Sequence, residues 1–167
     1  SEWNAAKMGP KRDVVGLLAK AIRRQNMRFL VALHHAENWW FFPHWRAEFD
    51  TADPRYADLY GEPHNQAWGA NPPTAKRKVL EWALQDKPSR AFLDTWLGKT
   101  KEVIDLYQPD VLWFDYALYW VQEHYMGEVG AYYFSRAQER NQDVVLTYKE
   151  KNLVPGSAVI DLELSRF

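Results

Sequence analysis

Apolar residues along the chain follow two spacings that alternate, one typical of helices and one typical of strands. After Asp13, a residue suited to cap a helix N-terminus, apolar positions recur every three or four residues and predict a surface helix to about Asn26. The run "MRFLVAL" at 27–33 is short, apolar and rich in strand-forming residues, so it predicts a buried strand. This strand stops at the polar pair His34 and His35.

The next segment has no sustained periodicity. From Ala36 to about Pro73 the sequence is rich in prolines and aromatic residues, which predicts a long loop that contains a helical turn. A short helix is expected over 74–84. Loops of this length inside a compact domain are usually functional, so we expect this segment to contribute to a site.

Regular spacing returns in the second half of the chain. Ser89 is expected to cap a long amphipathic helix that ends at "QPD", and a strand over 111–114 follows at once. A further helix is predicted over about 120–140, with strands over 143–148 and about 158–164. Apolar strands that alternate with helices imply right-handed βα units, and therefore an α/β fold with a parallel sheet and outer helices.

Polar side chains lie at or near the end of each predicted strand. They are His34, His35, Asp115, Lys149 and Glu163. A (β/α) barrel and an open α/β sheet both place their active site at the carboxyl ends of parallel strands. A carboxylate that ends an apolar strand, as Asp115 does, is costly to bury without partners. It is therefore either a structural acid in an ion pair or a group that takes part in the chemistry of a site.

Composition narrows the possible partners. A length of 167 residues with 47% hydrophobic content suits a single domain over 1–167. The net charge of −1 gives no reason to expect nucleic acid or an anionic membrane as a partner. The absence of cysteine excludes disulfides and thiolate chemistry but leaves the compartment open. No apolar run approaches ~20 residues and no signal peptide is apparent, so we expect a soluble chain.

The aromatic content of 16% points to flat, weakly polar ligands such as sugar rings, or to core packing. The segment "ENWWFFPHW", which contains Trp40, suits either an aromatic wall for a pyranose or a plug that closes a barrel end. His34 and His35 are either donors and acceptors for sugar hydroxyls or structural histidines. We expect no metal and no cofactor, because no third ligand has suitable spacing and no nucleotide or zincin motif occurs.

Two carboxylates at the ends of different parallel strands suit a retaining glycosidase. In that reaction one carboxylate attacks the sugar and the other protonates the leaving group. Asp115 and Glu163 are the candidates for these two roles. The alternative is a structural ion pair with Lys149 or an arginine.

Four blocks of the sequence occur in a characteristic order: "HHAENWW", "EFDTADPRYADLYGEPHN", "YQPDVLWFDYAL" and "VVLTYK…AVIDLELSR". They resemble the bacterial α-L-fucosidases of glycoside hydrolase family 29. The resemblance implies a partial TIM-like (β/α) barrel, with the family's N-terminal strands and C-terminal β-sandwich outside these residues. A partial barrel exposes sheet edges and apolar faces, so we expect a homo-oligomer in which a second copy completes the barrel.

The resemblance also implies roles for individual residues in hydrolysis of terminal α-L-fucosyl linkages. Asp115 would be the nucleophile that forms a covalent fucosyl-enzyme, and Glu163 the acid/base. Lys149 would favour the ionised carboxylate that attack requires. The expected substrate-binding side chains are His34, His35, Trp40, Trp113 and Lys149. One alternative is a catalytically silent fragment that binds fucose or only self-associates, and another is a metal-dependent hydrolase that uses the histidines.

Overall fold

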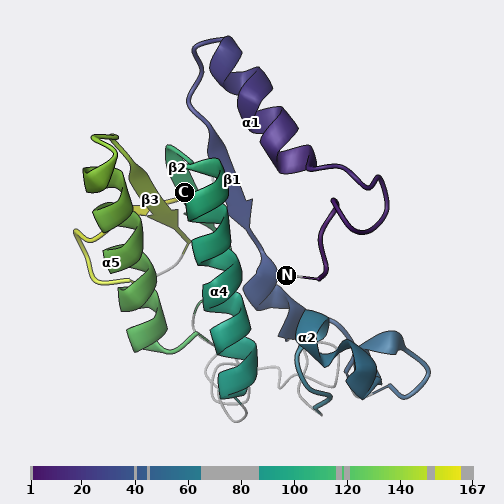
Figure 1. Ribbon diagram of the computed structural model, residues 1–167. Helices are drawn as coiled ribbons and strands as arrows, with labels where there is room; N and C mark the ends of the chain where they lie inside the picture. Colours follow the sequence, from purple (N-terminus) through teal and green to yellow (C-terminus); the bar gives the residue numbers. More distant parts are fainter. Residues whose placement is uncertain are drawn as a thin grey trace. The chain divides into compact units, whose positions relative to one another are not determined.

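Helices alternate along the chain with the first three of the four described parallel strands, as the spacing predicted (Figure 1). The computed structural model describes residues 2–39, 41–44, 46–64, 87–115, 118, 121–149 and 153–162. The α-helices are α1 (Val14–Arg24), α2 (Ala57–Tyr60), α4 (Arg90–Tyr107) and α5 (Glu123–Glu139). The 3-10 helices are η1 (His35–Trp39), η2 (Asp50–Ala52) and η3 (Pro54–Tyr56). The strands are β1 (Leu30–Leu33), β2 (Val111–Phe114), β3 (Val145–Tyr148) and β4 (Val159–Ile160).

The four described strands form one parallel sheet in the order β1-β2-β3-β4. Each strand pairs with the next strand along the chain, with Leu30 opposite Val111 and Val111 opposite Val145. This sequential order is the one a (β/α) barrel uses, whereas a doubly wound sheet reverses its order at one point. The predicted α/β class with parallel strands is confirmed.

The described residues divide into two compact units. The first contains those of Ser1–Leu33, Leu97–Asp115 and Glu123–Phe167, and the second those of His34–Trp96 and Tyr116–Gln122. The whole sheet belongs to the first unit, together with α1, α5 and α4 from Leu97 onward. None of the described helices is long and apolar enough to cross a membrane.

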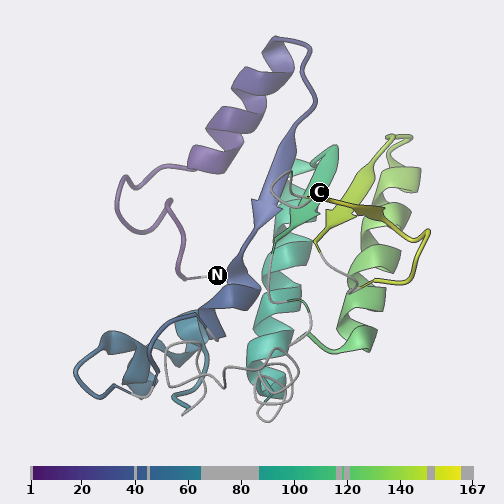
Figure 2. The same ribbon diagram turned by 180° about the vertical axis from the view of Figure 1, so that it is seen from behind.

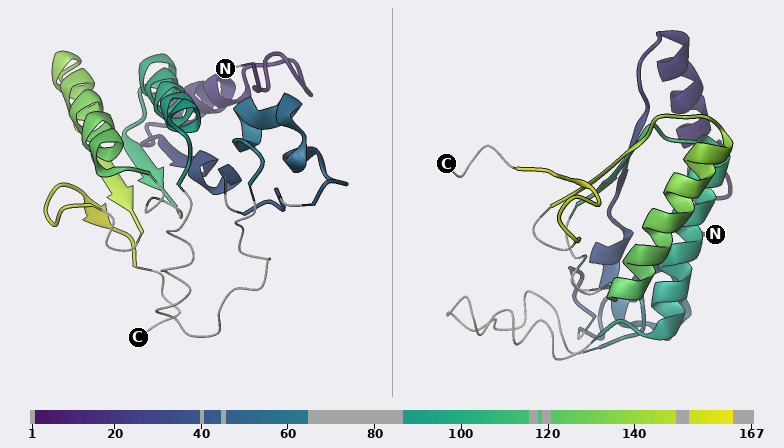
Figure 3. Two further views of the ribbon diagram at one scale, coloured as in Figure 1. Left: turned by 90° about the horizontal axis from the view of Figure 1, so that it is seen from below. Right: turned by 90° about the vertical axis from the view of Figure 1, so that its left-hand side faces the viewer.

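In the first unit, helices cover one face of the sheet. The part of α4 from Leu97 onward and α5 lie side by side on this face, and the strands lie in front of them when the molecule is seen from behind (Figures 2 and 3). Alternate side chains of β2 and β3 are buried on this side: Leu112, Phe114, Leu146 and Tyr148. Burial of these four side chains accounts for the apolar runs that predicted β2 and β3. The prediction of a buried strand at 27–33 is wrong for β1, because β1 lies at an edge of the described sheet and none of its four residues is buried.

The opposite face of the sheet is not covered by any described helix of the first unit. Its apolar side chains include Leu30, Val145 and Val159, which are 49%, 41% and 57% exposed. Trp113 and Thr147 lie on the same face, because they alternate with the buried residues of β2 and β3. Part of the candidate site lies on this open face.

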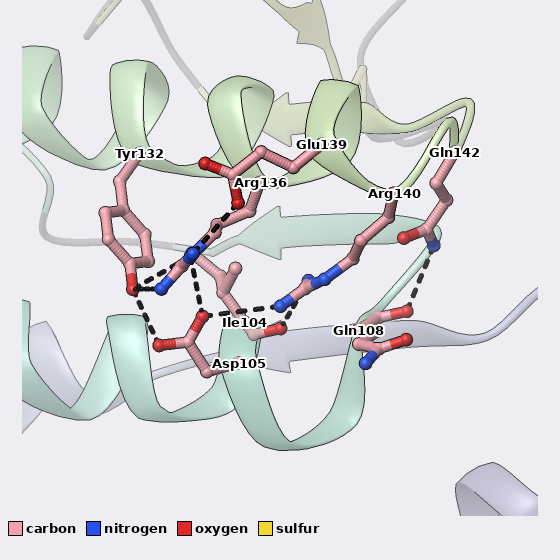
Figure 4. A network of polar contacts seen from close by, with 8 residues as sticks. All are labelled: Ile104, Asp105, Gln108, Tyr132, Arg136, Glu139, Arg140 and Gln142. Carbon is pink, nitrogen blue, oxygen red and sulfur yellow. Dashed lines mark hydrogen bonds and ion pairs between the residues drawn. The ribbon is translucent and has the colours of Figure 1, made fainter.

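A polar network holds α4 against α5 (Figure 4). The Asp105 carboxylate accepts a hydrogen bond of 2.6 Å from the Tyr132 hydroxyl and pairs with Arg136 at 3.1 Å and Arg140 at 3.4 Å. Arg140 also donates to the Ile104 carbonyl at 3.1 Å. These bonds join the C-terminal halves of the two helices and so help to fix α5 on the sheet.

A carboxylate outside the strands sets where β1 begins. Asp110 Oδ2 accepts the Phe29 N–H at 2.8 Å, and Oδ1 accepts from Arg28 at 3.2 Å and from Gln142 at 3.3 Å. Burial alone would raise the pKa of Asp110, but these three hydrogen bonds outweigh it and the pKa lies below its ordinary value. Because the Phe29 N–H is bound to Asp110, β1 begins at Leu30 and not at the predicted position 27.

Most other element boundaries agree with the sequence. Asp13 caps α1 by accepting the Gly16 N–H at 2.9 Å, and Ser89 Oγ accepts the Phe92 N–H at 3.1 Å at the start of α4. β3 begins two residues later than predicted, and β4 is limited to Val159–Ile160 among the described residues. The helix predicted over 74–84 lies outside the described residues.

The second unit contains a stack of aromatic rings. The ring centroids of Trp39 and His64 are 4.2 Å apart, and those of His64 and His44 are 4.4 Å apart. His44 is only 2% exposed, and its Nε2 lies 2.9 Å from the Asn38 carbonyl oxygen. Burial lowers the pKa of His44 below the ordinary value of 6.5, although the bond to Asn38 acts in the other direction.

This burial predicts a pH dependence of stability. Because the folded state holds His44 with a lowered pKa, it binds fewer protons than the unfolded state, and stability is lost as the pH falls below about 6.5. In urea denaturation near pH 7.5 and pH 5.5, His44→Phe should lose less stability on acidification than the unmodified chain. The exposed His124 provides the control as His124→Asn. Equal acid sensitivity in the unmodified chain and His44→Phe would contradict this prediction.

Candidate active site

The carboxyl ends of β2 and β3 bring Asp115 and Lys149 together. Asp115 follows β2 and Lys149 follows β3, and the register that pairs Phe114 with Tyr148 makes the two polar residues neighbours. The Lys149 Nζ lies 2.6 Å from Asp115 Oδ1, with side chains only 9% and 13% exposed. The expected association of these residues at the strand ends is therefore present. Their charges compensate one another where little solvent is available.

Trp113 provides an aromatic surface beside this pair. Its ring centroid lies 5.1 Å from the Lys149 Nζ, within the range of a cation–π contact. Trp113 also lines a hollow on the open face of the sheet. The lining residues are Leu30, Trp113, Thr147, Val159, Ile160 and Asp161. The hollow combines an aromatic side chain, aliphatic side chains and a carboxylate, which suits a partly apolar, hydroxyl-bearing ligand.

Asp161 is a residue of this region that the sequence interpretation missed. Its Oδ2 accepts a hydrogen bond of 3.1 Å from Trp113 Nε1, and its own N–H donates to the Tyr148 carbonyl at 2.7 Å. The signal was available, because residues 161 and 163 share one face of the predicted strand over 158–164.

The two histidines after β1 belong to the second unit. The His35 ring stacks on Phe92 with centroids 5.2 Å apart, and its Nδ1 lies 3.3 Å from the Asn38 Nδ2. This environment fits a structural histidine. His34 is exposed, and its ring offers a nitrogen within 4.8 Å of a carboxylate oxygen of Glu37.

Glu37 is a second residue that the sequence interpretation missed. Its Oε1 is buried and has no hydrogen-bond partner among the described residues. A buried acceptor without a donor is unusual and is often found where a ligand or water binds. His34 and Glu37 are therefore candidates to bind hydroxyl groups within the second unit. Trp40 and Glu163 lie outside the described residues, so their proposed roles stay predictions.

Comparison with known proteins identifies the family. A sequence model described as Alpha-L-fucosidase matches residues 1–164. Tissue alpha-L-fucosidase of Bos taurus is 46% identical over 41 residues, which are 25% of this chain and 8% of the relative. Alpha-L-fucosidase of Dictyostelium discoideum is 26% identical over 114 residues, or 68% of this chain and 17% of the relative.

The comparison covers only a small part of each relative. The matched segments cover less than a fifth of the length of either relative. Both relatives are eukaryotic, so the bacterial type expected from the sequence stays a prediction. The family model nevertheless spans nearly the whole chain, from residue 1 to residue 164. The chain therefore belongs to the α-L-fucosidase family.

Proposed function

We propose that the chain carries the nucleophile of a retaining α-L-fucosidase, with fucosylated glycans as substrates. The observation that carries this proposal is the ion pair of Asp115 and Lys149 at the carboxyl edge of a parallel sheet. Active sites of (β/α) enzymes lie at this edge. The Lys149 ammonium group lies 2.6 Å from the carboxylate proposed to attack the sugar and balances its charge where little solvent is available. Membership of the α-L-fucosidase family supports the choice of sugar.

In the proposed reaction, an Asp115 oxygen bonds to the anomeric carbon as the bond from that carbon to the leaving oxygen breaks. Glu163 gives its proton to the leaving oxygen. It then takes a proton from the water that displaces Asp115, so the anomeric configuration is retained. Retention needs the two carboxyl groups roughly 5–5.5 Å apart. Trp113 and Lys149 would contact the sugar.

The other substrate contacts in this proposal come from the segment after β1. His34 and His35 would bind fucose hydroxyls, and Trp40 would pack against the ring. Because the His35 ring is stacked on Phe92, we expect His35 to contribute less to fucose binding than His34.

Hydrolysis of 4-nitrophenyl α-L-fucoside tests the activity. We expect release of nitrophenol, with the α anomer of fucose as the first product in proton NMR spectra. A 2-fluorinated fucosyl donor should label the peptide that contains Asp115, as judged by mass spectrometry after digestion. A label on another side chain, or initial release of the β anomer, would contradict the mechanism.

A silent form is the second candidate, because an Asp115–Lys149 ion pair also fits a purely structural acid. Such a chain would bind fucose, or only self-associate, without turnover. Calorimetry with fucose beside the hydrolysis assay separates the two candidates. Binding without nitrophenol release would select the silent form.

We also propose that the sheet is a segment of a TIM-like (β/α) barrel within a single domain. The sequential strand order and the helices on one face of the sheet support this architecture. The open face, with exposed Leu30, Val145 and Val159, would then correspond to the barrel interior.

This open face supports the prediction that the chain self-associates. Exposed apolar faces and sheet edges favour association, so a second copy is proposed to cover the face. Size-exclusion chromatography with light scattering should give a mass of two or more chains at micromolar concentration. A charged variant on the face, Val159→Lys, should shift the population toward the monomer. A stable, well-folded monomer of the unmodified chain would contradict self-association.

A further inference from the structure

We propose that Asp161 is a positioning residue that holds Trp113, and through Trp113 the ammonium group of Lys149, against Asp115. The inference rests on the proposed function for its effect on turnover. The contacts themselves all lie within the first unit and involve β2, β3 and the residue that follows β4. They can therefore be tested apart from activity.

Backbone pairing with β3 fixes the position of Asp161 independently of its side chain. Asp161 follows β4 directly, and its N–H donates to the Tyr148 carbonyl at 2.7 Å, which continues the pairing of Tyr148 with Ile160. Tyr148 immediately precedes Lys149 in the chain. The position of Asp161 is thus tied to the strand end that carries the lysine.

The side chain of Asp161 then orients an indole ring. Its Oδ2 accepts the Trp113 Nε1–H at 3.1 Å, and an indole has no other polar group with which to fix its rotation. The Lys149 Nζ lies over this ring, 5.1 Å from the ring centroid. A carboxylate that accepts the N–H also adds electron density to the ring, which strengthens the attraction between the ring and a cation.

Lys149 depends on this support because its stem is flexible. Holding a lysine side chain in one conformation costs conformational entropy, because the side chain has four rotatable bonds. The ring limits the directions open to the ammonium group, which lies 2.6 Å from Asp115 Oδ1. Asp161 is therefore linked to Asp115 through two intervening side chains and acts on the nucleophile only through them.

Two variants separate positioning from simple structural support. Asp161→Ala removes the acceptor, whereas Asp161→Asn keeps an acceptor oxygen and removes only the charge. We expect Asp161→Ala to lower kcat on the order of 10- to 100-fold with a smaller change in KM, since misplaced catalytic groups have effects of this size. Asp161→Asn should recover most of the lost turnover. A similar loss of kcat in both variants would overturn the positioning role.

Two further measurements do not require activity. The Trp113 indole N–H signal, assigned in nitrogen-15 spectra by its absence from Trp113→Phe, should shift and exchange faster with solvent in Asp161→Ala but not in Asp161→Asn. The rate at which an N-hydroxysuccinimide ester acetylates Lys149, followed by mass spectrometry, should rise severalfold in Asp161→Ala alone. Unchanged N–H exchange and unchanged lysine reactivity in Asp161→Ala would overturn the inference.

These readouts keep the two proposals distinguishable. If the unmodified chain shows no hydrolysis while Asp161→Ala still raises the reactivity of Lys149, the positioning stands and the proposed function fails. If hydrolysis is present and Asp161→Ala changes neither turnover nor reactivity, the proposed function stands and the positioning fails. Should Asp161→Ala not fold, the comparison of Asp161→Asn with Asp161→Leu, which fills the site without an acceptor, decides the question by the same measurements.

Discussion

Replacement of Asp115 by alanine is expected to lower turnover of 4-nitrophenyl α-L-fucoside by roughly a thousandfold or more, since loss of a nucleophile has effects of this order. The variant removes the only group proposed to bond to the anomeric carbon. Steady-state nitrophenol release measures the effect. Binding of fucose should survive better than turnover, because the residue acts mainly in the transition state.

A small external nucleophile distinguishes a missing nucleophile from a misfolded protein. Azide fits the space left by the Asp115 carboxylate and should attack the anomeric carbon as nitrophenolate leaves. Asp115→Ala should then regain part of its turnover and form fucosyl azide of β configuration. Asp143→Ala provides the matched control. Asp143 is an exposed acid two residues before β3, at the end of that strand opposite to Lys149. A comparable loss in Asp143→Ala, or no rescue by azide, would contradict the role of Asp115.

Local signals made most of the fold predictable. Helix caps at Asp13 and Ser89 depend on side chains that bond the backbone a few residues away, so they can be recognised from sequence. The apolar runs of β2 and β3 reflect burial under helices on one face. Because parallel strands end at one edge, the association of Asp115 with Lys149 followed from the strand assignments.

The features that the sequence did not predict depend on contacts between distant segments. The start of β1 is set by Asp110, which lies 81 positions from Phe29 in the chain. The stacking of His35 on Phe92 likewise joins segments with no common sequence pattern. The hydrogen bond from the Trp113 indole to Asp161 also joins residues that lie 48 positions apart. Periodicity reports which face a side chain occupies but not which group it meets there.

Replacement of Lys149 by methionine is expected to lower the free energy of unfolding by about 3 kcal/mol, as is typical when one partner of a buried ion pair is removed. The change keeps the length of the side chain but leaves the Asp115 carboxylate, only 13% exposed, without its counter-ion at 2.6 Å. Urea denaturation measures the loss. Turnover should fall as well, because the carboxylate must be ionised to attack.

Lys101 offers a closely matched control. It also pairs with a carboxylate, that of Glu128, and its ammonium group also lies over an aromatic ring, 4.9 Å from the centroid of Tyr132. Its side chain is 29% exposed and that of Glu128 is 50% exposed, so solvent screens the pair. Lys101→Met should therefore cost about 1 kcal/mol or less. Equal losses of unfolding free energy in Lys149→Met and Lys101→Met would mean that the burial of Asp115 does not make the fold more dependent on the counter-ion of this carboxylate.

The double variant Asp115→Asn with Lys149→Met completes the test. It removes both charges of the Asp115–Lys149 ion pair, so neither partner is left uncompensated and the double variant should be more stable than Lys149→Met alone. Neither variant should hydrolyse the fucoside at an appreciable rate. Recovery of stability without recovery of turnover would separate the two roles of the ion pair. The Asp115 charge lowers stability when it is unpaired, and the same charge is proposed to attack the sugar. If the double variant is no more stable than Lys149→Met, the coupling between Asp115 and Lys149 is absent, and with it the electrostatic basis proposed for the nucleophile.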